Sequence, residues 1–240
     1  MRAELKLQID KNTTIPFNHQ YHLSSMIYNA LHTSNPEYAA KLHSYQKFKY
    51  FTFSWLDVPN RTVGKDGIKS RDGIVYLKLS SPDDEFLSTF LDGLFQEPIL
   101  KIGTFEVYPM EIKINEMPDS FSNKMTFKTL SPVYLKTKEE VDGKLKTKDL
   151  LPTHSKFFPN LKQNLINKYE LFYNKPCDMD FEMEILSAEQ KRIQIKETFT
   201  RCSHLIFTIQ GDPDLIRFGY ECGFGEKNSM GFGMVEEKKN

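Results

Sequence analysis

The amino-acid sequence predicts an α+β protein made of two consecutive βαββαβ halves. In each half, segments with the apolar period of a strand or of a helix come in the order strand, helix, strand, strand, helix, strand. A polar stretch from Met117 to Asn123, with Pro118 and two serines, has the composition of a linker. The order of elements is the ferredoxin-like arrangement, so two tandem ferredoxin-like domains are predicted at residues 1–120 and 121–240.

The first half begins with a strand and a helix. Residues 3–9 alternate apolar with polar side chains, as a half-buried strand does. From Asn18, apolar residues fall at i, i+3, i+4, i+7 and i+8, which predicts a helix with one buried face. They are Leu23, Met26, Ile27, Ala30 and Leu31. Tyr28 lies about 100° around the helix from Ile27, so its hydroxyl is expected at the helix edge.

A second, shorter helix is predicted to follow at once. Ser34 and Glu37 have the spacing of a capping box, which predicts a helix through Leu42. His43 lies at the end of this helix. Because the end of a helix carries partial negative charge, this position favours the protonated imidazole.

The remainder of the first half is predicted to form strands around a third helix. Residues 49–55 and 73–80 are rich in aromatic and β-branched side chains and predict strands. The segment 57–72 between them is polar and contains glycine, and it is expected to be mobile. A helix is predicted from residues 82–83, followed by a hairpin-like pair around Gly103.

The second half is predicted to repeat this order. No convincing sequence repeat relates the halves, so the predicted duplication depends on the order of elements alone. The predicted elements are a strand at 125–136, a helix at 156–173, strands at 181–186 and from Arg192, a short helix after Asp212, and a last strand at 231–236.

The composition is that of a globular protein. Of 240 residues, 39% are hydrophobic and 27% charged, and no run approaches the roughly 20 apolar residues of a membrane span. The N-terminus lacks the apolar core of a signal peptide, so a cytoplasmic protein is expected. Cys177, Cys202 and Cys222 are odd in number and form no C-x-x-C, which argues against a disulfide framework or a zinc site. We expect neither a metal nor a cofactor.

The charge balance places a condition on nucleic-acid binding. Basic and acidic residues are equal at 32 each, so such binding has to come from local clusters. A solvated loop surface is the alternative for each cluster. The candidates are Lys47, Lys49, Arg61, Lys65, Lys69 and Arg71, and then Lys144, Lys146, Lys148 and Lys156.

The most distinctive stretch runs from Gly219 to Gly233 and contains Gly-Phe-Gly twice, five residues apart. Glycine adopts positive φ and lets backbone N–H groups approach a bulky anion, so a phosphodiester is the candidate ligand. Phe224 and Phe232 are expected to face inward. A long turn between two core segments is the alternative. The polar tip consists of Glu226, Lys227, Asn228 and Ser229.

This stretch resembles the C-terminal glycine-rich loop of the repeat-associated RNA-binding superfamily of CRISPR systems. The stretch FNHQYHLSSMIYNAL near the N-terminus shares the resemblance, and the whole chain is similar to the metal-independent, repeat-cleaving endoribonucleases of that superfamily. The resemblance implies two ferredoxin-like domains and CRISPR repeat RNA, both precursor and processed, as the partner. The RNA-binding residues are then Gly223, Gly225, Lys227, Asn228, Ser229, Gly231 and Gly233.

The chemistry available to the chain is acid–base catalysis by side chains. A Walker motif, G-x-S-x-G and H-E-x-x-H are absent from the sequence. RNA, however, supplies its own nucleophile, because its 2′-hydroxyl can attack the adjacent phosphorus and leave a 2′,3′-cyclic phosphate and a 5′-hydroxyl. This cleavage needs a proton-transfer group, for which histidine is suited, and a cation near the phosphoryl oxygens.

Tyr28, His43 and Lys49 supply these side-chain types within 22 residues. In the contexts YNAL and LHSYQKFKYF they match the catalytic tyrosine, histidine and lysine of some superfamily members. By that resemblance, His43 is the principal proton-transfer group. Tyr28 orients or deprotonates the 2′-hydroxyl, and Lys49 stabilises the transition state. The structural alternatives are a helix cap for His43, edge packing for Tyr28 and a solvated Lys49.

The sequence also contains a rival catalytic histidine. His32 is four residues after Tyr28 and shares its helix face, and superfamily members differ in where their catalytic histidine lies. His19 and His22 lie at the helix start, where structural or RNA-contacting roles are expected.

Three functions remain open from the sequence. The first is a sequence-specific endoribonuclease that cuts CRISPR precursor RNA within repeats, which the joint presence of Tyr28, His43 and Lys49 favours. The second is a non-catalytic repeat RNA-binding protein of the same superfamily. The third is a small-molecule regulatory domain pair with the same fold. A CRISPR interference complex is a further candidate partner, no membrane association is expected, and the oligomeric state is expected to be a monomer or a weak homodimer.

Overall fold

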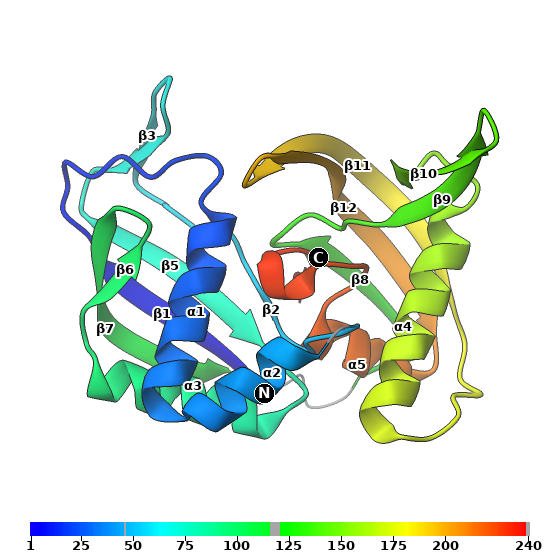
Figure 1. Ribbon diagram of the computed structural model, residues 1–240, viewed down its shortest axis with the longest axis horizontal. Helices are drawn as coiled ribbons and strands as arrows, with labels where there is room; N and C mark the ends of the chain where they lie inside the picture. The colour runs from blue at the N-terminus through cyan, green and yellow to red at the C-terminus, as the bar shows by residue number, and fades with distance from the viewer. Residues whose placement is uncertain (46, 116–120, 239–240) are drawn as a thin grey trace. The chain divides into compact units, whose positions relative to one another are not determined.

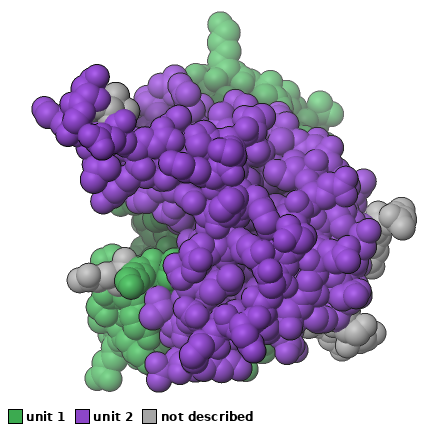
Figure 2. All heavy atoms as spheres, turned by 90° about the vertical axis from the view of Figure 1, so that its right-hand side faces the viewer, with its two compact units in different colours: residues 1–117, 229–231 green, residues 118–228, 232–240 purple. Residues whose placement is uncertain are grey.

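The computed structural model describes residues 1–45, 47–115 and 121–238, and it divides into two compact units. The first comprises Met1–Met117 with Ser229–Gly231, and the second comprises Pro118–Asn228 with Phe232–Asn240 (Figure 2). Positions 117–120 of the predicted linker lie outside the described residues. Both units combine helices with antiparallel sheets, which confirms the predicted mixed composition.

The first unit contains an antiparallel sheet in the order β2-β5-β1-β7-β6 (Figure 1). Along its whole length β1 pairs with both β5 and β7. Its side chains Ala3, Leu5 and Leu7 are fully buried in the core that also takes in the apolar face of the first helix. The strands are β2 (Thr52–Phe53), β5 (Ile74–Ser80), β1 (Arg2–Gln8), β7 (Phe105–Asn115) and β6 (Leu100–Ile102).

The helices α1 (Gln20–Ser34), α2 (Pro36–Ser44) and α3 (Asp84–Gln96) complete the core of this unit. All five apolar residues predicted for the buried face of α1 are buried. At Gly93 of α3, an added Cβ would lie 1.9 Å from the carbonyl oxygen of Ala30 in α1. The two helices therefore pack backbone to backbone at this point, which a side chain at position 93 would prevent.

One prediction for the first half is wrong in detail, and one hairpin was not predicted. The N-cap of α2 is Asn35 rather than Ser34, because the Asn35 side chain accepts the N–H of Tyr38 at 3.0 Å. The segment 57–72 contains the hairpin of β3 (Arg61–Val63) and β4 (Ile68–Ser70). These strands are short and mostly exposed, so they lack the apolar alternation from which strands are predicted.

The second unit has a sheet in the order β11-β12-β8-β13, with helices α4 (Phe157–Tyr173) and α5 (Pro213–Cys222). A separate ribbon of β9 (Lys136–Val141) and β10 (Lys144–Asp149) was not predicted, since its side chains are almost all polar. The sheet strands are β11 (Phe181–Ile195), β12 (Thr198–Gly211), β8 (Lys124–Thr129) and β13 (Val235–Glu237).

The predicted break between strands at 186 and 192 is wrong. β11 continues through it, with a register shift between Ile185 and Ser187, and the chain turns only after Ile195. A β-bulge interrupts the alternation of side chains without ending the strand, so the pattern resembles two strands.

Candidate active site

Tyr28 and His43 are brought together by the turn between α1 and α2. Asn35 closes α1 with its backbone N–H, which donates to the carbonyl of Leu31 at 2.8 Å, and the same residue caps α2. The half-buried ring of Tyr28 meets the ring of the exposed His43 edge to face, with centroids 5.7 Å apart and planes at 88°. Tyr28 also contacts the fully buried ring of Phe51, with centroids 5.9 Å apart. The phenol is therefore held between the core and the exposed imidazole.

Lys49 lies at the C-terminal end of α2. Its ammonium donates to the carbonyl oxygen of Leu42 at 2.8 Å and to that of His43 at 2.5 Å. Partial burial lowers the pKa of Lys49. An ammonium has three N–H groups, so these two carbonyls leave a third donor for an anionic ligand. The first unit thus gathers Tyr28, His43 and Lys49, whose catalytic roles stay predictions.

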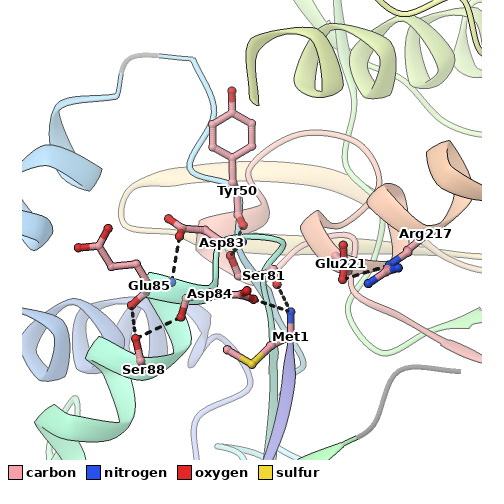
Figure 3. A network of polar contacts seen from close by, with 9 residues as sticks. All are labelled: Met1, Tyr50, Ser81, Asp83, Asp84, Glu85, Ser88, Arg217 and Glu221. Carbon is pink, nitrogen blue, oxygen red and sulfur yellow. Dashed lines mark hydrogen bonds and ion pairs between the residues drawn. The ribbon is translucent and has the colours of Figure 1, made fainter. Parts of the chain in front are cut away.

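The segment that carries Lys49 is anchored at the next residue. Tyr50 has a φ of 52°, which is uncommon outside glycine, and its carbonyl oxygen accepts the Ser81 hydroxyl at 2.7 Å (Figure 3). The Ser81 oxygen in turn accepts the N–H of Asp83 at 3.0 Å. The carboxylate of Asp83 caps α3 by accepting the N–H of Glu85 at 3.1 Å. The backbone beside Lys49 is therefore tied to the start of α3.

The hydroxyl of Tyr28 is hydrogen-bonded to the side chain of Ser229, which belongs to the first unit. Burial raises the pKa of Tyr28 to about 12, and the bond to Ser229 opposes this increase. Ser24, one turn earlier on α1, donates its hydroxyl to the carbonyl oxygen of Ser229 at 2.8 Å. Tyr28 is consequently a neutral phenol at physiological pH, with its hydroxyl held by a partner.

The other histidines of the first helix differ in their surroundings. His19 is 3% exposed; its Nδ1 lies 2.8 Å from the carbonyl oxygen of Pro16, and its Nε2 accepts the N–H of Leu56 at 3.2 Å. The proton therefore resides on Nδ1, and burial lowers the pKa of His19 to about 4. His32 is exposed in the last turn of α1, and it is His43 that makes the ring contact with Tyr28.

The glycine-rich segment turns around a buried lysine. Lys168 of α4 is 2% exposed. Its ammonium donates to the carbonyl oxygens of Gly223 at 2.8 Å and Gly225 at 2.6 Å, and to Oδ1 of Asn228 at 2.7 Å. All four residues belong to the second unit.

Asn228 extends this network to both copies of Gly-Phe-Gly. Its Nδ2 donates to the carbonyl oxygen of Phe224 at 3.3 Å and to that of Phe232 at 3.0 Å. Both phenylalanine side chains are fully buried, as the sequence predicts. At Gly225, where φ is 77°, an added Cβ would lie 2.5 Å from the carbonyl oxygen of Tyr134. Glycine at this position is therefore required by packing inside the unit.

The residues predicted to bind RNA are exposed to different degrees. Lys227 is partly exposed; its ammonium lies 4.4 Å from the ring centroid of Tyr134 and 3.2 Å from Oγ1 of Thr200. Burial lowers the pKa of Lys227. Ser229 is also partly exposed, whereas Gly223, Gly225, Asn228, Gly231 and Gly233 are buried. A role of this segment in RNA binding stays a prediction.

Two residues of these networks were missed by the sequence interpretation. Lys168 follows Leu161 and Leu165 on the apolar face of α4, and a lysine on such a face is a recognisable signal of a buried cation with partners. Ser24 interrupts the buried face of α1 next to Leu23. A serine on a buried face is too common to indicate a hydrogen bond to a distant residue.

The remaining reactive groups form no further centre in the described part of the chain. Cys177, Cys202 and Cys222 are free thiols, and burial raises the pKa of each. Within residues 1–45, 47–115 and 121–238, no group of three or more His, Cys, Asp or Glu side chains is arranged to hold a metal ion. The helices found there are too short or too polar to cross a membrane.

Comparison with known proteins identifies the family. Residues 14–113 match "CRISPR-associated protein Cas6, N-terminal", and residues 114–237 match "CRISPR associated protein Cas6, C-terminal". The chain is 54% identical over 236 residues to "CRISPR-associated endoribonuclease Cas6 1" of Methanocaldococcus jannaschii. The aligned region covers 98% of this chain and 92% of that protein. A solved structure described as "CRISPR associated protein Cas6" aligns with a TM-score of 0.89 at 53% identity, over 100% of this chain and 99% of the other. Another, described as "An RAMP protein binding different RNA substrates", aligns with a TM-score of 0.91 at 30% identity over 100% of both chains. The chain therefore belongs to the Cas6 family of CRISPR-associated proteins.

Proposed function

We propose that this chain is a sequence-specific endoribonuclease that cleaves CRISPR precursor RNA within the repeats. The observation that carries the proposal is the convergence of Tyr28, His43 and Lys49 on one unit of a chain whose relative at 54% identity is named an endoribonuclease. The three side chains supply a hydrogen-bonding hydroxyl, a proton-transfer group and a cation, which are the parts that cleavage by the RNA's own 2′-hydroxyl needs.

In this mechanism the 2′-hydroxyl gives up its proton to a solvent water and attacks the adjacent phosphorus, and the bond to the 5′-oxygen breaks. His43, exposed at the end of α2, donates a proton to the leaving 5′-oxygen. Tyr28 orients the 2′-hydroxyl as a neutral hydrogen-bond partner, because its raised pKa disfavours the phenolate at neutral pH. Lys49 offers its third N–H to a phosphoryl oxygen as negative charge develops there. The products are a 2′,3′-cyclic phosphate and a 5′-hydroxyl, and no metal takes part.

Two ferredoxin-like domains are proposed at residues 1–120 and 121–240, and each contains the sheet of one unit. The sheet orders support this assignment. In the first unit β1 lies between β5 and β7, and in the second unit β8 lies between β12 and β13. This count sets aside the two separate hairpins, β3–β4 and β9–β10, and the edge strand β6. The first strand of each unit (β1 or β8) then lies between its third strand (β5 or β12) and its fourth (β7 or β13), as in the ferredoxin-like arrangement. The second domain contributes the glycine-rich segment as an RNA-binding element, and CRISPR repeat RNA is the partner.

The test uses RNA transcribed from the CRISPR repeats of the source genome, incubated with the protein in excess chelator. We expect cleavage at one site and a cyclic phosphate on the 5′ product. A single 2′-deoxyribose on the 5′ side of the cut should stop cleavage but leave binding largely intact, because the nucleophile belongs to the RNA. Cleavage of the deoxy substrate would contradict the mechanism, and tight binding without any cleavage would support the non-catalytic alternative.

A further inference from the structure

The buried ammonium of Lys168 is the centre of the network that shapes the glycine-rich segment. It reaches three oxygens within 2.8 Å, two of which are backbone carbonyls of the first Gly-Phe-Gly copy. Burial lowers the pKa of Lys168, and the three acceptors oppose this shift, because a protonated amine has three N–H groups to offer them and a neutral amine has two. Burying such a charge is costly unless it is hydrogen-bonded, which the three oxygens achieve.

The same network reaches the second Gly-Phe-Gly copy through one amide. Asn228 accepts from Lys168 with Oδ1, and this fixes Nδ2 toward the carbonyl oxygens of Phe224 and Phe232. Lys168 therefore contacts the first copy directly and the second copy through Asn228.

The backbone between these contacts is also held by hydrogen bonds from the N–H groups of Phe224, Glu226 and Gly233. Gly223, Gly225 and Gly233 have φ values of 86°, 77° and 77°, and glycine loses more conformational freedom on ordering than any other residue. The carbonyl oxygen of Gly233 accepts the N–H of Phe224 at 2.9 Å, whereas the buried carbonyl oxygens of Gly223 and Gly225 need a strong donor from elsewhere. The lysine supplies that donor for Gly223 and Gly225.

We infer that Lys168 is a positioning residue for RNA binding, because it fixes the conformation in which the glycine-rich segment meets RNA. This inference rests on the proposed function. Lys168 is 2% exposed and acts only through the segment, not by contact with RNA. Losing it releases the two glycine carbonyls and Asn228, so the segment samples other conformations and RNA affinity falls. The chemical step, which the proposal assigns to Tyr28, His43 and Lys49, should change little.

The primary test is Lys168→Met, which keeps the length of the side chain but removes its donors and charge. We expect the dissociation constant for repeat RNA to rise about tenfold or more, because buried acceptors are left unpaired. The single-turnover rate at saturating protein should stay within about threefold of the wild-type rate. Amide hydrogen exchange in residues 219–233 should become faster. Lys168→Arg keeps the charge and several donors and should restore part of the affinity.

Leu161→Ala is the matched control. Leu161 lies on the same helix and is fully buried, but its side chain does not donate to the segment. The Leu161→Ala variant should have an unfolding temperature lowered at least as much as that of Lys168→Met, with unchanged affinity for RNA. If both variants weaken binding equally, Lys168 acts only through the stability of the unit and the inference is wrong.

A double-mutant cycle with Asn228→Ala completes the experiment, and Asn228→Ala alone replaces the primary test if Lys168→Met does not fold. The losses of affinity in the two single variants should be strongly non-additive, because both break one network. Additive losses would mean that Lys168 and Asn228 act independently of each other, which contradicts the inference. Folded Asn228→Ala protein with wild-type affinity would also overturn it. If the wild-type protein itself binds no repeat RNA, the proposed function fails instead, so the two failures are distinguishable.

Discussion

The ring of Tyr28 and the ring of His43 lie edge to face, 5.7 Å apart between centroids and 88° apart in plane. Because the two residues come from different helices, this contact depends on the tight turn at Asn35. It makes His43 the histidine beside the phenol, and His43 is also the residue whose carbonyl oxygen accepts from Lys49.

The first prediction separates the two exposed histidines. His43→Ala should lower the single-turnover cleavage rate by at least about a hundredfold, the usual scale for losing a general acid or base, with RNA affinity little changed. His32→Ala should cost less than about tenfold. Both variants are measured under saturating protein with the same repeat RNA. An inactive His32→Ala protein beside an active His43→Ala protein would reverse the assignment of the catalytic histidine.

The second prediction concerns the protonation state of Tyr28. Since burial raises its pKa to about 12, the hydroxyl acts as a neutral hydrogen-bond partner. Tyr28→Phe should lower the cleavage rate by about tenfold to a hundredfold through loss of that hydrogen bond. The rate should follow the same pH dependence in variant and wild type between about pH 6 and pH 9, because a neutral phenol does not titrate there. If the wild-type cleavage rate changes with pH at the basic end of this range and the variant's rate does not, Tyr28 works as a phenolate base.

The third prediction compares two glycines with similar backbone angles. Gly225 and Gly143 have φ values of 77° and 70°, but an added Cβ would lie 2.5 Å from the Tyr134 carbonyl oxygen at Gly225 and would meet nothing within 4 Å at Gly143. Gly143→Ala therefore carries only the backbone strain of about 1–2 kcal/mol. Gly225→Ala carries the strain and the collision, so its loss of stability should be clearly larger. Urea unfolding of both variants measures the difference, and equal losses would mean that the segment shifts to accept the methyl group.

The fourth prediction concerns the pH dependence of stability in the first unit. The pKa of His19 falls from 6.5 to about 4 on folding, so the folded state favours the neutral ring. Its contribution is fully present above about pH 6.5 and is lost as the pH falls through 4, a change of roughly 3 kcal/mol. Replacing His19 with Gln removes the titrating group, so the loss of stability between pH 7 and pH 4 should be smaller than in the wild type by about that amount.

The fluorescence of Trp55 provides the measurement for this prediction. Trp55 is the single tryptophan of the chain and lies in the first unit, with its ring 6.5 Å from that of His19. Its signal in urea therefore reports the unfolding of the unit that contains His19. Equal pH dependence in both proteins would show that His19 is not held neutral.

Elements with a clear apolar period were predictable from the sequence. The buried face of α1 was identified from Leu23 to Leu31, and the family resemblance drawn from the glycine-rich segment is confirmed by the match over residues 114–237. The short strands around Arg61 and the ribbon from Lys136 to Asp149 could not be found in this way. Their side chains are mostly exposed, and backbone pairing alone leaves no apolar pattern.

The candidate site was only partly predictable for a different reason. Residue types suggested Tyr28, His43 and Lys49, but sequence patterns report which face of an element is buried and not which distant groups meet. The bond from Ser24 to Ser229 joins residues 205 positions apart, and the bonds of Lys168 cross 55 to 60 positions. Such contacts are set by the packing of whole elements, so they become visible only in three dimensions.

The backbone contact between Gly93 and Ala30 has a consequence for genetics. Every other amino acid at position 93, alanine included, adds a Cβ that collides with the Ala30 carbonyl, so α3 and α1 must move apart. Tyr28 lies on α1 just before Ala30 and would be displaced with it. A random-mutagenesis screen for strains that no longer process repeat transcripts should therefore recover substitutions at Gly93, a residue to which no contact with RNA is assigned.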